Sequence, residues 1–482
     1  MTSLIEVLFA EVVRWLPSPH DIASLDCTSR LFHLGYPRSP VEEGLRLRAE
    51  ADGRAAVAAL PAGETSWTQW LLWEERRVPL ARIPVIASSE FHSVFVDAVG
   101  QLRTCGKSPM IREMAAEPTI LGQGWGVHLS VVPRAVAGLG GVHIRTVAAG
   151  TIHSLACCDK GVAYSFGYGD SGALGHGDTD CQHTPRAIEM QGDEHISAVA
   201  AGDEFSLALS RTGALYSFGY GHEGALGHGD WNNQHTPLLV AALQGVRVAA
   251  VAANPSAALA LGEAGEVYSL GAVPADPDSF EHTQNTPQVI AGLEGVRVCA
   301  MATAYGHCLV VSKEGRLYSF GTPSSRFSLG HGLDRDQPFC PLEMLKPQLV
   351  TALQGVRVLA VATGGCHSLA LSETGEVYSF GGCHRSPFGY GAPLGHGGDE
   401  EQLTPVVIPG LKGVHSVSAG ECTSFAVTNG GVVYSWGGWC GAPETWPDYQ
   451  EPQVPGPPVL GLLTDRQCAP RQIPSLQCLV HT

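Results

Sequence analysis

The sequence has few basic side chains and no cluster of them. Its 482 residues include 29 Lys and Arg against 46 Asp and Glu, so the net charge is −17 with histidine neutral. Proteins that grip DNA or RNA through phosphates need clustered Lys and Arg. We therefore expect no direct nucleic-acid binding, and an acidic surface that suits protein partners, including basic ones.

Long apolar runs, processing signals and metal-ligand spacings are also lacking. No run of 18 apolar residues is present, so no membrane span is expected. Glu6 and Glu11 interrupt the N-terminus without a preceding basic region, which argues against a signal peptide. The 14 cysteines form no C-x-x-C pair, and several, such as Cys157 and Cys308, lie in apolar runs. We expect buried thiols, a cytoplasmic or nuclear location, and neither metal nor cofactor.

Glycine and proline are abundant, at 59 and 32 residues. They are spread along the chain without a three-residue period, which indicates many tight turns rather than a collagen-like chain. Helix-forming runs are short over most of the sequence. These features favour an all-β fold.

One sequence block recurs seven times. Its clearest copies are AYSFGYGDSGALGHGD (163–178) and LYSFGYGHEGALGHGD (215–230). Related anchors begin at Leu102, Val267, Leu317, Val377 and Val433. A Thr-Pro pair follows most anchors, then Gly-Val-Arg-Val, an Ala/Val run and a short alternating strand. Each copy therefore predicts four short strands, with Thr-Pro on an outer strand, where a missing N–H costs least. Seven such sheets packed radially bury each face against a neighbour.

These blocks resemble the regulator-of-chromosome-condensation repeat, whose members form seven-bladed propellers of four-stranded blades. The resemblance covers 80–460 and implies ring closure by strands from both chain ends that complete one blade. By this comparison Arg82–Ala87 is the last strand of a repeat that lacks its beginning. The segment 461–482 is expected to be a C-terminal tail. The fourth copy loses its glycine turn and the fifth carries an insert, and such loops on a rigid scaffold favour binding specificity.

The first 79 residues differ and predict a small all-α region. Leu4, Leu8, Val12 and Leu16 form an i, i+4 stripe, and Asp21 caps a second helix. The run from Asp21 to Phe32 resembles the second half of an F-box, a segment that docks on the adaptor subunit of cullin-type ubiquitin ligases. The resemblance implies that the contact uses Leu8, Val12, Ile22, Leu25 and Phe32. The alternative is a helical cap that seals the propeller.

Candidate catalytic motifs are explained by the repeat. Gly169-Asp-Ser171-Gly172 is similar to a serine-protease loop, but the next copy has Gly221-His-Glu-Gly224 at the same place. Gly106-Lys-Ser108 lacks the spacing of a phosphate-binding loop. The recurring histidines are spread one per copy, so a structural hydrogen-bonding role is favoured over metal binding. We expect no catalytic residue and no enzyme activity.

The function indicated is a protein-binding scaffold. Our first hypothesis is a substrate-recognition adaptor of a cullin-type ubiquitin ligase, whose partners are the adaptor subunit and an unknown target. The alternative is a guanine-nucleotide exchange factor for a small GTPase, an activity that the resemblance implies. Photoreception is not favoured, because the repeated Gly-Trp-Arg-His-Thr motif that it uses is missing from the sequence.

Overall fold

The computed structural model describes the propeller region of the chain. The described residues are 86–97, 99–108, 119–271, 284–304, 306–322, 327–332, 342–382, 394–398, 400–438 and 467–477. The chain divides into two compact units, 1–81 with 481–482, and 82–480. The predicted all-α region, with Leu8, Val12, Ile22, Leu25 and Phe32, lies outside the described residues and stays a prediction. Within the described ranges no helix is long and apolar enough to cross a membrane.

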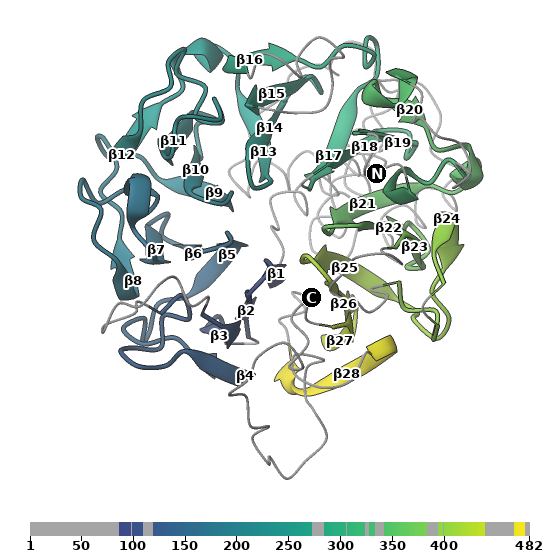
Figure 1. The fold of residues 1–482 in the computed structure, drawn as a ribbon, viewed down its shortest axis with the longest axis horizontal. Coiled ribbons are helices and arrows are strands. Elements are labelled where there is room, and N and C mark those ends of the chain that lie inside the picture. Colours follow the sequence, from purple (N-terminus) through teal and green to yellow (C-terminus); the bar gives the residue numbers. More distant parts are fainter. Residues whose placement is uncertain are drawn as a thin grey trace, which may run out of the picture. The chain divides into compact units, whose positions relative to one another are not determined.

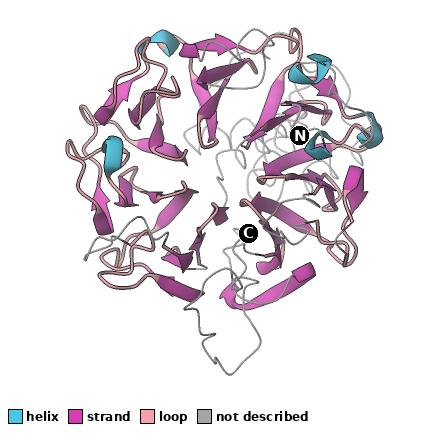
Figure 2. Ribbon diagram, in the orientation of Figure 1, coloured by secondary structure: helices cyan, strands magenta, loops and turns pink. Residues whose placement is uncertain are grey.

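Seven antiparallel four-stranded sheets follow one another around a ring, as Figures 1 and 2 show. We number these blades one to seven in chain order. The inner strands are β1 (Ile86–Ser88), β5 (Ile144–Ala149), β9 (Ile196–Ala201), β13 (Val248–Ala253), β17 (Val298–Thr303), β21 (Val358–Thr363) and β25 (Val414–Ala419). The second strands are β2 (His92–Val96), β6 (His153–Cys158), β10 (Phe205–Ser210), β14 (Ala257–Gly262), β18 (His307–Ser312), β22 (His367–Ser372) and β26 (Thr423–Thr428). The predicted seven-bladed all-β architecture is confirmed.

All seven predicted anchors form the third strand of a blade. These strands are β3 (Leu102–Lys107), β7 (Ala163–Gly167), β11 (Leu215–Gly219), β15 (Val267–Gly271), β19 (Leu317–Gly321), β23 (Val377–Gly381) and β27 (Val432–Gly437). Alternation along β23 sends Phe380 into the core with no exposed surface. The same position holds Phe166, Phe218, Phe320 and Trp436 in other blades, each at most 1% exposed.

The outer strands are β4 (Leu129–Ala135), β8 (Gln182–Ala187), β12 (Gln234–Leu239), β16 (Gln284–Val289), β20 (Gln348–Leu349), β24 (Gln402–Val407) and β28 (Gln467–Gln477). Four of them, β8, β12, β16 and β24, carry a Thr-Pro pair. Short 3-10 turns are η2 (Asp170–Gly172), η3 (Ala241–Leu243), η6 (Leu342–Leu345) and η7 (Thr351–Leu353). In β8, Pro185 lies where the register with β7 shifts, so its missing N–H interrupts no regular ladder. The predicted edge position of Thr-Pro is confirmed.

The expected closure of the propeller by a shared blade is wrong. Every blade is built from four strands that are consecutive in the chain. Strand β1, expected as the last strand of a repeat, is instead the inner strand of blade one and pairs with β2 through Ser88 and Ser93. The two ends of the ring meet through side chains, where the Ser88 and Thr423 hydroxyls lie 3.2 Å apart. A second hydroxyl contact of 2.8 Å joins Ser88 to Ser93.

The segment expected to be a C-terminal tail supplies a strand. Within 461–482, β28 pairs antiparallel with β27 and completes blade seven. Ile473 of this strand is 1% exposed and belongs to the apolar cluster that includes Phe95 and Phe425. Burial of this side chain against blades one and seven stabilises β28 on the propeller.

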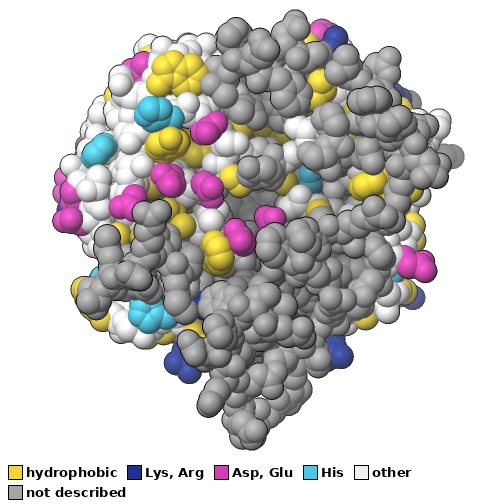
Figure 3. All heavy atoms as spheres, in the orientation of Figure 1, with side chains coloured by type: hydrophobic (Ala, Val, Ile, Leu, Met, Phe, Trp, Pro, Cys, Tyr) yellow, Lys and Arg dark blue, Asp and Glu magenta, His cyan; other side chains and the backbone are white. Residues whose placement is uncertain are grey.

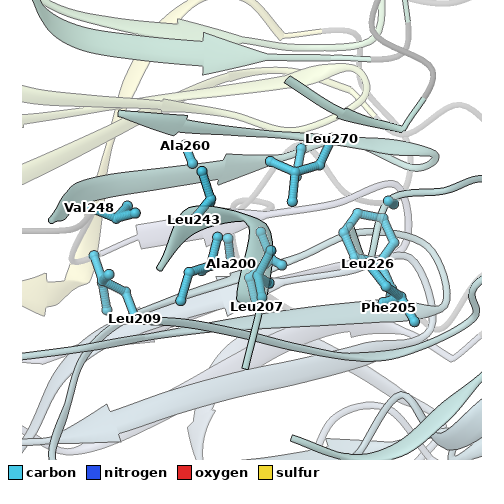
Figure 4. Packing of buried hydrophobic residues seen from close by; sticks show 14 residues of the cluster. Ala200, Phe205, Leu207, Leu209, Leu226, Leu243, Val248, Ala260 and Leu270 are labelled. Carbon is cyan, nitrogen blue, oxygen red and sulfur yellow. The ribbon is translucent and has the colours of Figure 1, made fainter. Parts of the chain in front are cut away.

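The hydrophobic core is divided into layers between neighbouring blades. The layer between blades three and four contains Phe205 and Leu207 from one blade and Val248 and Leu270 from the next (Figure 4). Equivalent clusters lie between other neighbouring pairs, including blades six and seven, where Trp436 is buried. Each sheet therefore buries both faces, which explains the strongly apolar second strands.

Two glycine positions of the repeat permit close approach between blades. Gly175 of the Gly-His-Gly turn has φ +74°, and a Cβ there would lie 2.8 Å from the Phe218 ring of the next blade. Gly315, between β18 and β19, has φ +80° and accepts a 2.9 Å hydrogen bond from the Val358 N–H at the start of the next inner strand. Glycine is required at both positions because other residues rarely adopt this conformation.

Candidate protein-interaction surface

One face of the propeller gathers two sets of loops. Because the strands of each blade alternate in direction, the turns from inner to second strand and the loops from third to outer strand end on the same side. We call this side the rim face. On the face drawn in Figure 3, acidic side chains gather around the inner ends of the blades, over β1, β5 and β9.

Three rim carboxyl groups come from blades that are distant in sequence. Glu90, Asp203 and Glu421 lie in the inner turns of blades one, three and seven. Burial, then the charges of Glu421 and Asp203, raise the pKa of the Glu90 carboxyl. Burial and the Asp203 charge likewise raise the pKa of Glu421. The ring thus brings carboxylates together so that they destabilise one another's charged forms.

A fourth rim carboxylate is held by a strained residue. Ser171 has φ +60°, and it is the only non-glycine residue with positive φ within the described ranges. Its hydroxyl donates a 3.1 Å hydrogen bond to Oε2 of Glu204, which belongs to the next blade. The serine therefore orients a carboxylate and shows no sign of a protease nucleophile.

Aromatic side chains are exposed in the outer loops of the same face. Trp125 is 69% exposed, and its ring lies over His183 with the two ring centroids 3.8 Å apart and tilted by 32°. Tyr220 and His222 stack with centroids 5.1 Å apart. Trp231 is 39% exposed. Exposed aromatic side chains are typical of protein-binding surfaces, where they become buried on association.

The histidines at the starts of second strands link neighbouring blades beneath the rim. His153 Nε2 lies 2.8 Å from Ser206 Oγ of the next blade. The Ser206 hydroxyl donates to the Ala173 carbonyl, so the imidazole N–H is the donor to this serine. Equivalent pairs are His92 with Ser154, His307 with Ser368, and His367 with Ser424. The predicted structural role of these histidines is confirmed.

The second set of histidines acts within blades two, three, five and six. His176 of the Gly-His-Gly turn lies 2.9 Å from Ser165 Oγ of the anchor strand, and that hydroxyl donates to the Leu174 carbonyl. The same contact is made by His228, His331 and His396 with Ser217, Ser319 and Ser379. The turn and its anchor strand are thereby fixed to each other. Across the described part of the chain, no three His, Cys, Asp or Glu side chains are arranged to hold a metal ion.

Four of the described cysteines show two kinds of chemistry. Burial raises the pKa of the Cys157 and Cys308 thiols to about 12, so both stay protonated and pack as small apolar groups, as predicted. Cys366 and Cys422, at equivalent inner turns of blades six and seven, are disulfide-bonded. The expectation that the cysteines are buried free thiols is therefore wrong for these two.

Sequence reasoning missed the rim face. None of the predicted site residues lies within the described ranges, whereas the rim residues were not singled out as a site. A signal was present: acidic residues follow the Ala/Val run in Gly202-Asp-Glu204 and Gly420-Glu421. Their convergence required the ring closure, which brings blades one and seven together.

The seven contiguous blades and their loop-bearing face define a β-propeller scaffold. A family model, described as the RCC1-like domain, matches residues 121–438. The chain belongs to this family. The human E3 ubiquitin-protein ligase HERC2 is 33% identical over 318 residues, which make up 64% of this chain and 5% of HERC2. The ultraviolet-B receptor UVR8 of Arabidopsis thaliana is 32% identical over 298 residues, 61% of this chain and 65% of the receptor.

The chain thus spans less than two thirds of the length of either relative. Among solved structures, Prp20p from Saccharomyces cerevisiae matches with a TM-score of 0.62 at 23% identity, covering 83% of this chain and 89% of Prp20p. This likeness shows the fold. The relatives support a protein-interaction propeller as the class of function.

Proposed function

We propose that this protein is a substrate-recognition adaptor of a cullin-type ubiquitin ligase. In this proposal the propeller binds the target through its rim face, and the segment 1–79 docks on the adaptor subunit through Leu8, Val12, Ile22, Leu25 and Phe32. The chain supplies recognition, and its partners supply the ligase chemistry.

The observation that carries the proposal is a rigid scaffold with an exposed aromatic and acidic face. Rigid presentation of loops reduces the entropy lost on binding. Two further features support a ubiquitin-ligase context. The run from Asp21 to Phe32 resembles part of an F-box, and a protein named as an E3 ubiquitin-protein ligase contains a stretch that is 33% identical to this propeller.

The test is retention of a purified adaptor subunit by the immobilised full-length protein. We expect the wild type to retain it, and Ile22→Asp or Phe32→Asp to weaken retention at least roughly 10-fold, because a charge is placed at an apolar contact. Trp231→Ala, on the propeller, is the matched control and should retain the subunit fully. Failure of the wild type to retain the adaptor subunit would overturn the proposal.

The second candidate is guanine-nucleotide exchange on a small GTPase. Exchange requires a surface that binds the nucleotide-free state better than the nucleotide-bound state. The carboxylates of Glu90, Asp203 and Glu421 favour this candidate, because they would repel the phosphates of a bound nucleotide. Release of a fluorescent GDP analogue from a panel of small GTPases tests it. Acceleration that is lost in Asp203→Asn would support exchange, and intrinsic rates throughout the panel would argue against it.

A further inference from the structure

Two features of the rim face, an exposed tryptophan and a group of carboxylates, lie on blades one, three and seven. The first is Trp125, which stands between Gly124 and Gly126, both with positive φ and no atom within 4 Å of a Cβ placed there. His183 supports the indole ring, and 69% of the Trp125 surface remains exposed. The residue is therefore held in position on open surface rather than packed into the propeller.

The second feature is uncompensated negative charge. Among the ion pairs between described residues, none involves Glu90, Asp203 or Glu421. On the opposite face two ion pairs are formed: Arg247 lies 3.1 Å from Glu263, and Arg357 lies 3.9 Å from Glu373. On the rim face Asp178 does have a basic partner, Arg186 at 3.4 Å, whereas Glu90, Asp203 and Glu421 have none among the described residues.

We propose that the rim face of blades seven, one, two and three binds a basic segment of a protein partner, with a Lys or Arg side chain over Trp125. A cation above an indole ring is attracted by the negative face of the π-system. The carboxylates along the inner rim attract further positive charges of the same segment. Charge complementarity selects this occupant, because the same carboxylates repel nucleic acid and acidic peptides. The inference refines the proposed function by giving the chemical class of its target.

The test uses full-length protein and a fluorescein-labelled twelve-residue peptide of alternating Arg and Gly. Fluorescence anisotropy should report binding of this peptide and no binding of its Glu–Gly counterpart. Trp125→Ala should weaken binding roughly 3- to 10-fold, as expected for loss of a cation–π contact of about 1 kcal/mol. The double variant Asp203→Asn, Glu421→Gln should weaken it by a similar factor.

Two control variants lie on the opposite face. Val99 is 63% exposed between β2 and β3, and Glu189 is exposed between β8 and β9. Val99→Ala and Glu189→Gln should leave peptide affinity within roughly 2-fold, because they remove apolar surface or charge away from the rim. Equal weakening by rim and control variants would show non-specific attraction to an acidic protein and overturn the proposal. The proposal would also be overturned if Ca²⁺ stabilised the fold while the peptide did not bind, because the carboxylates would then serve a cation instead of a basic segment.

The peptide experiment and the adaptor experiment fail independently. Ile22→Asp should bind the peptide normally while losing the adaptor subunit, and Trp125→Ala should do the reverse. If the protein binds the peptide but does not retain the adaptor subunit, the proposed rim site is supported and only the proposed role in a ubiquitin ligase is wrong.

Discussion

The buried histidines of the second strands make the stability of this protein depend on pH. Burial lowers the pKa of His153 and His307 from 6.5 to about 4. Burial, followed by the charge of a neighbouring histidine, lowers the pKa of His92 and His367 to about 3. In the unfolded chain the same imidazoles take up protons near pH 6.5. Between these values the unfolded state binds more protons, so the stabilisation is complete above pH 6.5 and is lost as pH falls towards 4.

We therefore expect the free energy of unfolding to fall from pH 7.5 to pH 5 more steeply in the wild type than in His153→Gln. Removing one such histidine should reduce the slope by about 1 kcal/mol per pH unit. Urea unfolding at several pH values measures it. His222→Gln, at an exposed position, should leave the slope unchanged. Equal slopes for wild type and His153→Gln would show that His153 takes no part in the acid response.

Glycine at the turns between second and third strands gives a second residue-level prediction. A Cβ on Gly315 would overlap the Arg357 side chain of the next blade and lie 3.0 Å from its Cα, whereas a Cβ on Gly355 would meet no atom within 4 Å. Both have positive φ, so both alanine variants share a conformational cost of about 1–2 kcal/mol. Gly315→Ala should lose about 1–3 kcal/mol more, because the seam between blades five and six must shift. Thermal unfolding of the two variants tests this, and equal losses would contradict it.

At the scale of elements, β28 completes blade seven as its outer strand. Ile473 packs with Phe95 and Phe425, so Ile473→Ala should cost about 2–5 kcal/mol of unfolding free energy. Arg471→Ala changes an exposed side chain of the same strand and should stay within about 0.5 kcal/mol. Denaturant unfolding of both variants is the measurement. A small loss for Ile473→Ala would mean that β28 contributes little to the core.

The sequence predicted those elements that carry a repeated pattern and missed those that do not. Six of the seven third strands were identified from their Tyr-Ser anchors, and β3 from the weaker copy Leu102-Arg-Thr-Cys-Gly106. β28 was missed because Pro470 and Pro474 interrupt its pattern and no Thr-Pro pair marks it, although proline is tolerated on such an outer edge. β1 was assigned to a shared blade by resemblance. The sequence around β1 instead matches an inner strand. Ser88 lies four residues before His92, as Ala149 at the end of inner strand β5 lies four residues before His153.

At the scale of the whole molecule, the acidic rim is a property of the closed ring. Its carboxylates lie in different repeats, at Glu90, Asp203 and Glu421. No pattern within one repeat therefore predicts that their charges interact. Most strand pairings are local and were predictable from the repeat, whereas the seam between blades one and seven joins residues 335 positions apart. The candidate site therefore could not be predicted from repeats alone.

The mutual repulsion on the rim gives a prediction for the whole molecule. Because the pKa of Glu421 is raised, its charged form destabilises the folded state at neutral pH. Glu421→Gln should therefore raise the melting temperature at pH 7, and the gain should shrink as pH falls and the wild-type carboxyl takes up its proton. Calorimetry at pH 7 and pH 5 measures both effects, with Glu189→Gln as the control. A lowered melting temperature at pH 7 would show that Glu421 is stabilised by a partner.

Building each blade from consecutive strands has a consequence for how the ring comes apart. Where the first and last segments share a sheet, separating them breaks a ladder of backbone hydrogen bonds. Here the junction consists of the Ser88–Thr423 hydroxyl contact and of apolar side chains such as Phe95 and Phe425, whose rings lie 5.7 Å apart. Blades one and seven can therefore separate at this junction while all seven sheets keep their backbone hydrogen bonds. The stability of the closed ring at this junction therefore comes from side-chain packing between blades one and seven, and not from a strand shared by the two chain ends.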